Sequence, residues 1–91
     1  MYFILTIRDT QEARCPGYYC SLSRARQAVE NNYCDMLECG YYKYAVILYI
    51  RENCLYPDPK ECAWYSCDID DNVEKIERPV ELSNYYPYIL G

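Results

Sequence analysis

Three hexapeptides of the sequence share one frame, in which four residues separate two cysteines. They are CPGYYC (15–20), CDMLEC (34–39) and CAWYSC (62–67). Such pairs can bind zinc or form disulfides, and reduced cysteines pack as small hydrophobic side chains. Residues five apart point to opposite faces of a strand and lie about 140° apart on a helix, so only a loop brings them together. We therefore favour reduced thiols and predict no metal; zinc and disulfides are the alternatives.

The first residues, MYFILTIRDT, lack the cationic segment, long apolar run and cleavage site of a secretion signal, and no stretch is long enough to cross a bilayer. We therefore expect a cytoplasmic protein without a membrane partner. Intracellular proteins keep their thiols reduced, which agrees with the interpretation of the cysteines. The odd number of cysteines, seven, leaves at least one without a partner in the chain.

Catalytic groups are scarce, because the chain has no histidine, the side chain best suited to proton transfer near neutral pH. No cysteine stands in a recognisable nucleophile motif. The run DIDDNVE (68–74) lacks the glycine and the terminal glutamate of a calcium-binding loop. We expect a protein that is not an enzyme and needs no cofactor.

Charge and tyrosine content indicate a binding protein. The net charge of −5 argues against binding to extended nucleic acid and favours a basic protein surface as partner. Thirteen of the 91 residues are tyrosines, a residue type that supplies contact area at recognition surfaces and also occurs on ordinary sheet surfaces. The predicted interface residues are Tyr41, Tyr42, Tyr44, Tyr85, Tyr86 and Tyr88.

A possible ligand site lies around the start of the predicted helix. Tyr18 and Tyr19 directly precede it, and Arg24 and Arg26 lie within it. A helix N-terminus attracts anions, and tyrosine rings can stack on bases, so these four residues suit a small nucleotide. No glycine-rich phosphate loop accompanies them.

The pattern of apolar residues predicts one α+β domain over residues 1–91. Strands are expected at 2–8, 33–38 and 41–50, and a hairpin at 63–69 and 73–79. A helix is expected over 21–32, with Leu22, Ala25, Ala28 and Val29 on its apolar face. Residues 9–20, with a turn at Pro16-Gly17, and residues 52–61 are expected to be loops. The result is an antiparallel sheet of about four to five strands with one principal helix packed on one face.

The strand at 41–50 is apolar on both of its faces, although one helix can cover only one face of a sheet. The second face therefore needs another cover. We expect a homodimer that buries it, and the competing possibility is that the tail, residues 81–91, folds back over it.

The segments MYFILT, AVENNYCDMLE, GYYKYAVILYI, AWYSCDID, IERP and SNYYPYILG together resemble a class of small uncharacterised proteins encoded by phages and prophages of gut Firmicutes. The resemblance implies a protein that acts in the cytoplasm of a bacterial host. Small phage proteins of this size often inhibit host defence by binding. We therefore expect an inhibitor of a host defence protein that acts through a tyrosine-rich acidic surface. The alternative is a sequestering protein for a signalling nucleotide of host immunity.

Overall fold

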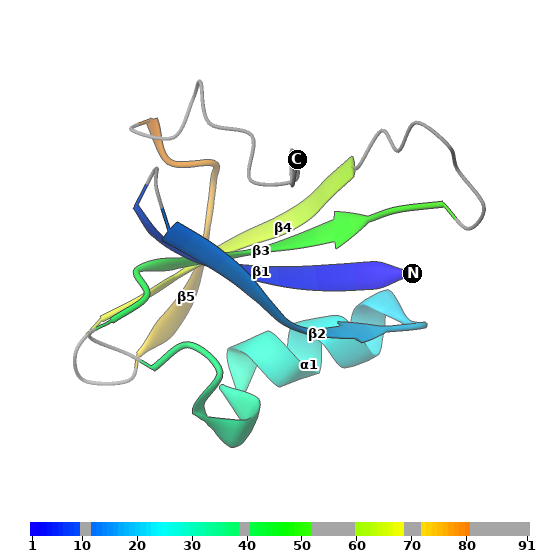
Figure 1. Ribbon diagram of the computed structural model, residues 1–91, viewed down its shortest axis with the longest axis horizontal. Helices are drawn as coiled ribbons and strands as arrows, with labels where there is room; N and C mark the ends of the chain where they lie inside the picture. Colours follow the sequence, from blue (N-terminus) through cyan, green and yellow to red (C-terminus); the bar gives the residue numbers. More distant parts are fainter. Residues whose placement is uncertain (10–11, 39–40, 52–59, 69–71, 81–91) are drawn as a thin grey trace.

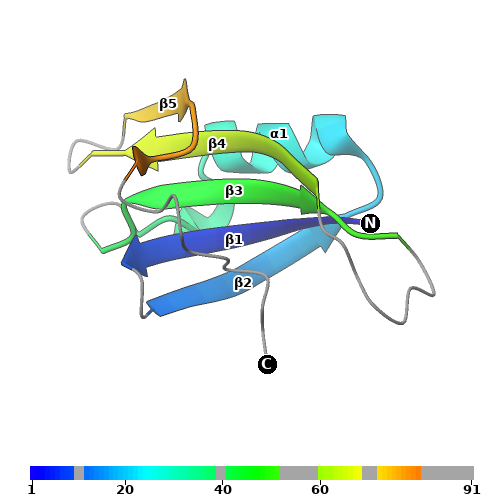
Figure 2. The same cartoon turned by 90° about the horizontal axis from the view of Figure 1, so that it is seen from above.

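The computed structural model describes residues 1–9, 12–38, 41–51, 60–68 and 72–80 of the chain. These residues form an antiparallel sheet of five strands in the order β2-β1-β3-β4-β5, with one α-helix packed against one face (Figures 1 and 2). The predicted α+β fold is therefore confirmed. The elements are β1 (Tyr2–Asp9), β2 (Glu12–Tyr19), α1 (Leu22–Glu30), the 3-10 turn η1 (Tyr33–Asp35), β3 (Tyr44–Tyr49), β4 (Lys60–Cys67) and β5 (Val73–Ile76).

The centre of the sheet consists of β1 and β3, the two most apolar segments of the chain. Ile4 pairs with Ile47 and Leu5 with Val46 in an antiparallel register. Because successive side chains of a strand alternate between the faces, Ile4 and Ile47 point toward α1 while Leu5 and Val46 point away from it. Both predicted strands are confirmed, and both have apolar side chains on each face.

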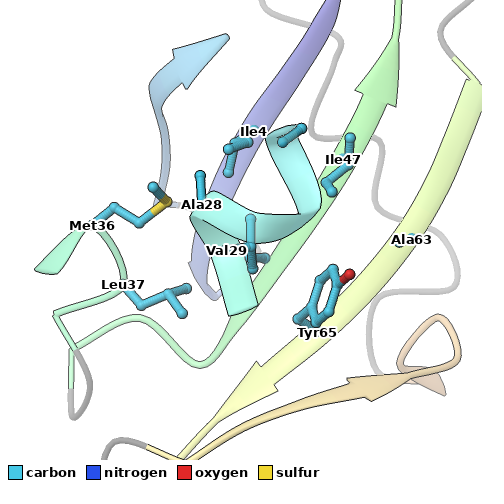
Figure 3. Packing of buried hydrophobic residues seen from close by; sticks show 10 residues of the cluster. Ile4, Ala28, Val29, Met36, Leu37, Ile47, Ala63 and Tyr65 are labelled. Carbon is cyan, nitrogen blue, oxygen red and sulfur yellow. The ribbon is translucent and has the colours of Figure 1, made fainter. Parts of the chain in front are cut away.

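The helix is confirmed within the predicted range 21–32, although it is shorter than that range at both ends. The Ser21 side chain accepts a hydrogen bond from the Arg24 backbone N–H at 3.4 Å, and Asn31 is the C-terminal cap. Ala25, Ala28 and Val29 are fully buried. Two of these side chains are alanines, so the helix axis can approach the sheet closely, and Tyr65 of β4 fills the space beside them (Figure 3).

The prediction of a loop over residues 9–20 is wrong, because residues 12–19 form β2. Among the described strands, β2 lies at the edge of the sheet and pairs with β1 alone. Proline has no N–H to donate, but an edge strand leaves half of its backbone groups unpaired, so Pro16 is tolerated there without a turn. The register between β1 and β2 shifts between Ile4 and Thr6, which accommodates the Pro-Gly pair as an irregularity within a strand.

The prediction of a strand over residues 33–38 is also wrong. This stretch is a series of tight turns that begins with η1. A positive φ is found at the residue that precedes it, Asn32 (47°), and at three residues within it, Cys34 (55°), Asp35 (53°) and Glu38 (41°). Met36 and Leu37 are adjacent in sequence, and both are buried in the core on the helix side of the sheet (Figure 3). A strand would send two adjacent side chains to opposite faces, so the core contact favours the turns.

The second face of the sheet is buried within the single chain. Its apolar side chains are Leu5, Ile7, Val46, Leu48 and Trp64, none more than 5% exposed. At the β5 side, Arg78 lies over the Trp64 ring and forms an ion pair with Glu61, which accepts a hydrogen bond from Trp64 Nε1 at 3.0 Å. The homodimer was predicted because this face needed a cover, and that reason no longer holds. The homodimer itself stays a prediction. The tail that was the competing cover lies outside the described residues.

Candidate functional site: an arginine–tyrosine cluster beside a strained turn

The four residues of the predicted nucleotide site do not converge. Tyr18 and Tyr19 are adjacent in β2 and point to opposite faces of the sheet. Tyr18 is 62% exposed and contacts Phe3 with ring centres 5.6 Å apart, whereas Tyr19 packs against the core on the helix side. Arg24 and Arg26 lie two residues apart on α1, about 200° around its axis, so they point in opposite directions.

Arg26 is already paired within the chain. Its Nε lies 3.5 Å from Glu30 Oε2, and Glu30 also accepts a hydrogen bond of 2.8 Å from the hydroxyl of Tyr65. The phenol of Tyr65 and the carboxylate of Glu30 raise the pKa of Arg26. An open depression of about 320 Å³ lies beside these groups and is lined by Leu22, Ser23, Arg26, Gln27 and Glu30. Because Glu30 compensates the charge of Arg26, the depression lacks the excess positive charge that a phosphate group needs.

The structure brings together two of the predicted interface residues. Tyr41 and Tyr42 contact each other edge to face, with ring centres 4.8 Å apart. Tyr44 lies on the second face of the sheet, where it packs partly buried against the apolar cluster. The other three predicted residues, Tyr85, Tyr86 and Tyr88, lie outside the described residues.

Two arginines from neighbouring strands stack on these two rings. The guanidinium of Arg8 in β1 lies 4.7 Å from the centre of the Tyr41 ring, and that of Arg14 in β2 lies 4.9 Å from the centre of the Tyr42 ring. A cation at this distance is attracted by the π-electrons of the ring. Tyr42 is 5% exposed and anchors the group, whereas Tyr41 is 39% exposed. We call Arg8, Arg14, Tyr41 and Tyr42 the arginine–tyrosine cluster.

Arg14 joins this cluster to the turns after α1. One guanidinium nitrogen donates to the backbone oxygen of Met36 at 3.1 Å and lies 3.5 Å from the carboxylate of Glu38. The Asn32 side chain holds the same turns from within, because it accepts a hydrogen bond from the Leu37 N–H at 2.9 Å and donates one to Asp35 at 3.1 Å. The strained backbone is therefore held from both sides.

The turns and the start of the next segment present four exposed side chains of two chemical types. They are Tyr33, Asp35, Glu38 and Tyr41, which we call the tyrosine rim. Tyr33 is 46% exposed, and the backbone N–H of Tyr41 donates to the oxygen of Glu38 at 2.7 Å, so the rim is continuous with the cluster. The rim is tyrosine-rich and acidic, and it adjoins two exposed arginines: Arg8 stacks on Tyr41, and Arg14 pairs with Glu38.

Sequence reasoning missed the roles of Arg8, Arg14, Tyr33 and Glu38. Tyr33 and Glu38 were assigned to a strand, and no local pattern connects Arg8 with Tyr41, which lies 33 positions later. Their contact follows from the backbone hydrogen bond between Lys43 and Ile7, which places the start of the β3 segment beside the end of β1. The sequence signal for the turns after α1 was the pair Asn31-Asn32, because asparagine tolerates the left-handed conformation better than most residue types do.

Among the five cysteines in the described residues, one departs from the prediction. Cys15, Cys20, Cys34 and Cys62 are free and exposed. Cys67 is disulfide-bonded, so the expectation of a reduced thiol is wrong for this residue. Each repeated frame contains at least one free cysteine, so none of the three frames closes on itself. Although both residues are exposed overall, desolvation by neighbouring groups raises the pKa of the Cys15 and Cys62 thiols, which favours the less reactive protonated form.

Within the described ranges, no three acidic or cysteine side chains gather in a way that could hold a metal ion. In the same residues, no helix combines the length and the apolar character needed to cross a membrane. Comparison of the chain with protein-family models, curated proteins and solved structures found no match.

Proposed function

We propose that the chain is a non-enzymatic binding protein of phage type that inhibits a host protein, with defence proteins as the first candidates. It acts in the bacterial cytoplasm, and its contact surface is the tyrosine rim. The observation that carries this proposal is the backbone of the segment that bears the rim. Within seven residues, Asn32 to Glu38, four non-glycine residues have a positive φ.

Such a backbone is costly. The left-handed conformation destabilises a non-glycine residue by about 1–2 kcal/mol, and residues in sparsely populated conformations cluster at binding sites and switch regions. Here the buried Leu37, the Asn32 side chain and the Arg14 guanidinium hold the segment in place. A surface held this firmly before a partner arrives loses little conformational entropy on binding.

The chemistry of the rim and the cluster supports a protein partner. Tyrosine and arginine are the residue types most enriched at the energetically important positions of protein interfaces. The rim adds two carboxylates, of which Glu38 is paired with Arg14, and the chain as a whole has a net charge of −5. A basic surface would therefore be steered toward this protein by long-range attraction and could place its own cations against the rim.

The test is affinity capture from a bacterial host lysate with three matched tyrosine variants. Tyr33→Ala and Tyr41→Ala remove the exposed rings of the rim, and Tyr18→Ala removes an exposed ring elsewhere on the sheet. Quantitative mass spectrometry identifies proteins enriched by the wild type, and calorimetry then measures the affinity of the purified partner. We expect Tyr41→Ala to weaken binding at least tenfold, which corresponds to about 1.4 kcal/mol, and Tyr18→Ala to leave it unchanged.

Circular dichroism must first show that all three variants keep the wild-type fold. A partner that binds the two rim variants as tightly as the wild type would show that the rim is not the contact surface. Recovery of no protein, together with a nucleotide that co-purifies with the chain, would instead favour the sequestering function.

A further inference from the structure

Two sulfur atoms lie together where β1 begins and β2 ends. The Sγ of Cys20 lies 3.7 Å from the Sδ of Met1. The contact follows from the strand register, because Tyr2 pairs with Tyr19 and Met1 and Cys20 are the next residues along this antiparallel pair. Side chains opposite one another in such a pair have Cβ atoms about 4.5–5.5 Å apart. Pairing of the two strands therefore brings a thiol and a thioether together.

Backbone contacts hold both residues in place. The Met1 amino group donates to the Ile50 oxygen at 3.1 Å, and the Ile50 N–H donates to the Met1 oxygen at 3.0 Å, so Met1 is also paired on its β3 side. Cys20 directly precedes Ser21, the N-terminal cap of α1, whose backbone oxygen accepts a hydrogen bond of 3.0 Å from Ala25. A ligand would therefore meet two sulfur atoms that need little further ordering.

The two side chains suit one class of metal ion. A thiolate and a thioether are soft ligands, which select Cu(I), zinc or iron–sulfur clusters. Structural zinc sites take four protein ligands and iron–sulfur clusters take four cysteines, so two sulfur atoms suit neither, whereas Cu(I) is stable with two. The prediction that the chain holds no metal concerned ligand sets drawn from the cysteines, and it did not include a methionine from a neighbouring strand.

Two other exposed thiols differ from Cys20 in their contacts. Cys15 donates to the backbone oxygen of Gly17 at 3.5 Å, and Cys62 donates to that of Lys60 at 3.6 Å. A backbone oxygen is a hard ligand, which suits calcium or magnesium rather than Cu(I). Cys20 is exposed as well, so a metal ion can reach it directly from solvent.

We propose that Cys20 and Met1 form a binding site for a soft monovalent metal ion, Cu(I). Cys20 binds as the thiolate, so its thiol proton passes to solvent, and Met1 binds through a lone pair of its Sδ. The oxidation states of the metal and of both sulfur atoms stay the same. The site lies at the end of β1 opposite to Arg8, so it is separate from the tyrosine rim and does not depend on the proposed function.

Protection of thiols from alkylation tests the site in the full chain. The protein is mixed under anaerobic conditions with one equivalent of Cu(I), ascorbate to keep the metal reduced, and bicinchoninate as a competing chelator. A pulse of N-ethylmaleimide modifies accessible thiols, and fragmentation of the tryptic peptides 15–24 and 61–75 reports Cys15, Cys20 and Cys62 separately. Because two linked ligands bind more tightly than one, we expect Cu(I) to slow modification of Cys20 at least about tenfold and that of the other two less than about twofold.

Removal of the Met1 sulfur distinguishes this site from a single reactive thiol. Norleucine incorporated in place of methionine replaces the sulfur atoms of Met1 and Met36 by methylene groups, and Met36→Leu changes the second residue alone. Norleucine should abolish the protection of Cys20, and Met36→Leu should retain it. Competition with bicinchoninate should show that Cys20→Ser weakens Cu(I) binding at least about tenfold and that Cys62→Ser leaves it unchanged.

Circular dichroism establishes the wild-type fold of each protein before metal is added. Equal protection of Cys15, Cys20 and Cys62 would overturn the proposal, and so would protection of Cys20 that persists in folded norleucine-containing protein. An unchanged affinity of Cys20→Ser for Cu(I) would do the same. Because Cys20 is exposed, this serine variant keeps the proposal testable even if norleucine at the buried position 36 disturbs the core.

Discussion

The hydroxyl of Tyr65 in β4 donates a 2.8 Å hydrogen bond to the carboxylate of Glu30 in the last turn of α1. Burial of the ring and this carboxylate both raise the pKa of Tyr65 above its ordinary value of 10.0. The bond is a polar link between the helix and β4, and the same carboxylate also pairs with Arg26, one helical turn earlier on α1.

Tyr65→Phe should therefore change the dependence of stability on alkaline pH. In the wild type the folded state holds the phenol proton more tightly than the unfolded state, so this contribution is complete below pH 10 and is lost as the pH rises above 10. The variant should lose about 1 kcal/mol near neutral pH and show a flatter stability profile above pH 10. Urea unfolding at a series of pH values measures both effects. Tyr18→Phe is the matched control, and an equally steep alkaline decline in both variants would contradict the assignment to Tyr65.

Arg14→Ala should loosen the turns after α1. The substitution removes the hydrogen bond to the Met36 oxygen, the ion pair with Glu38 and the stacking on Tyr42, so we expect a loss of about 1–2 kcal/mol in unfolding free energy. Arg24→Ala removes an exposed arginine on the helix and should change stability by less than about 0.5 kcal/mol. Amide hydrogen exchange should accelerate at residues 36–38 in Arg14→Ala alone. Unchanged exchange at these amides would show that Arg14 does not hold the turns.

Cys34→Gly should stabilise the protein, contrary to the usual effect of glycine. Cys34 has a φ of 55° and an exposed side chain, so glycine relieves left-handed strain of about 1–2 kcal/mol and gives back part of that in backbone entropy. We expect a net gain of about 0.5–1 kcal/mol, measured by thermal unfolding. Ser23→Gly, at an exposed position of α1, should instead cost about 0.5 kcal/mol. A destabilised Cys34→Gly would mean that the side chain contributes more than the backbone strain costs.

The predicted homodimer can be tested by light scattering over a dilution series. A dimer would have to use a surface other than the second sheet face, because Leu5, Val46 and Leu48 are already buried within one chain. The homodimer prediction requires a mass of about twice the 10.9 kDa of the chain at micromolar concentration. A mass of 10.9 kDa at every dilution would contradict self-association and leave the rim free for a different partner.

Local pattern was sufficient for the segments whose structure depends on near neighbours. Ser21, the spacing of Ala25, Ala28 and Val29, and the paired asparagines determine α1, because capping and helical periodicity act within a few residues. The runs of β-branched and aromatic residues in β1 and β3 likewise determine two strands with apolar faces on both sides. These features were enough to predict the α+β class.

Only the tertiary structure decided which side chains form a surface. Pro16 and Gly17 favour a turn locally, yet β1 offers hydrogen bonds at its free edge, and pairing there outweighs the local preference. Residues 33–38 were predicted as a short strand, but burial of both Met36 and Leu37 on the helix side of the sheet requires turns. The contacts of Arg8 with Tyr41 and of Arg14 with Tyr42 join segments that only sheet pairing brings together. Composition shows that tyrosine is abundant, but which tyrosines lie together depended on strand order, a long-range property that no local pattern encodes.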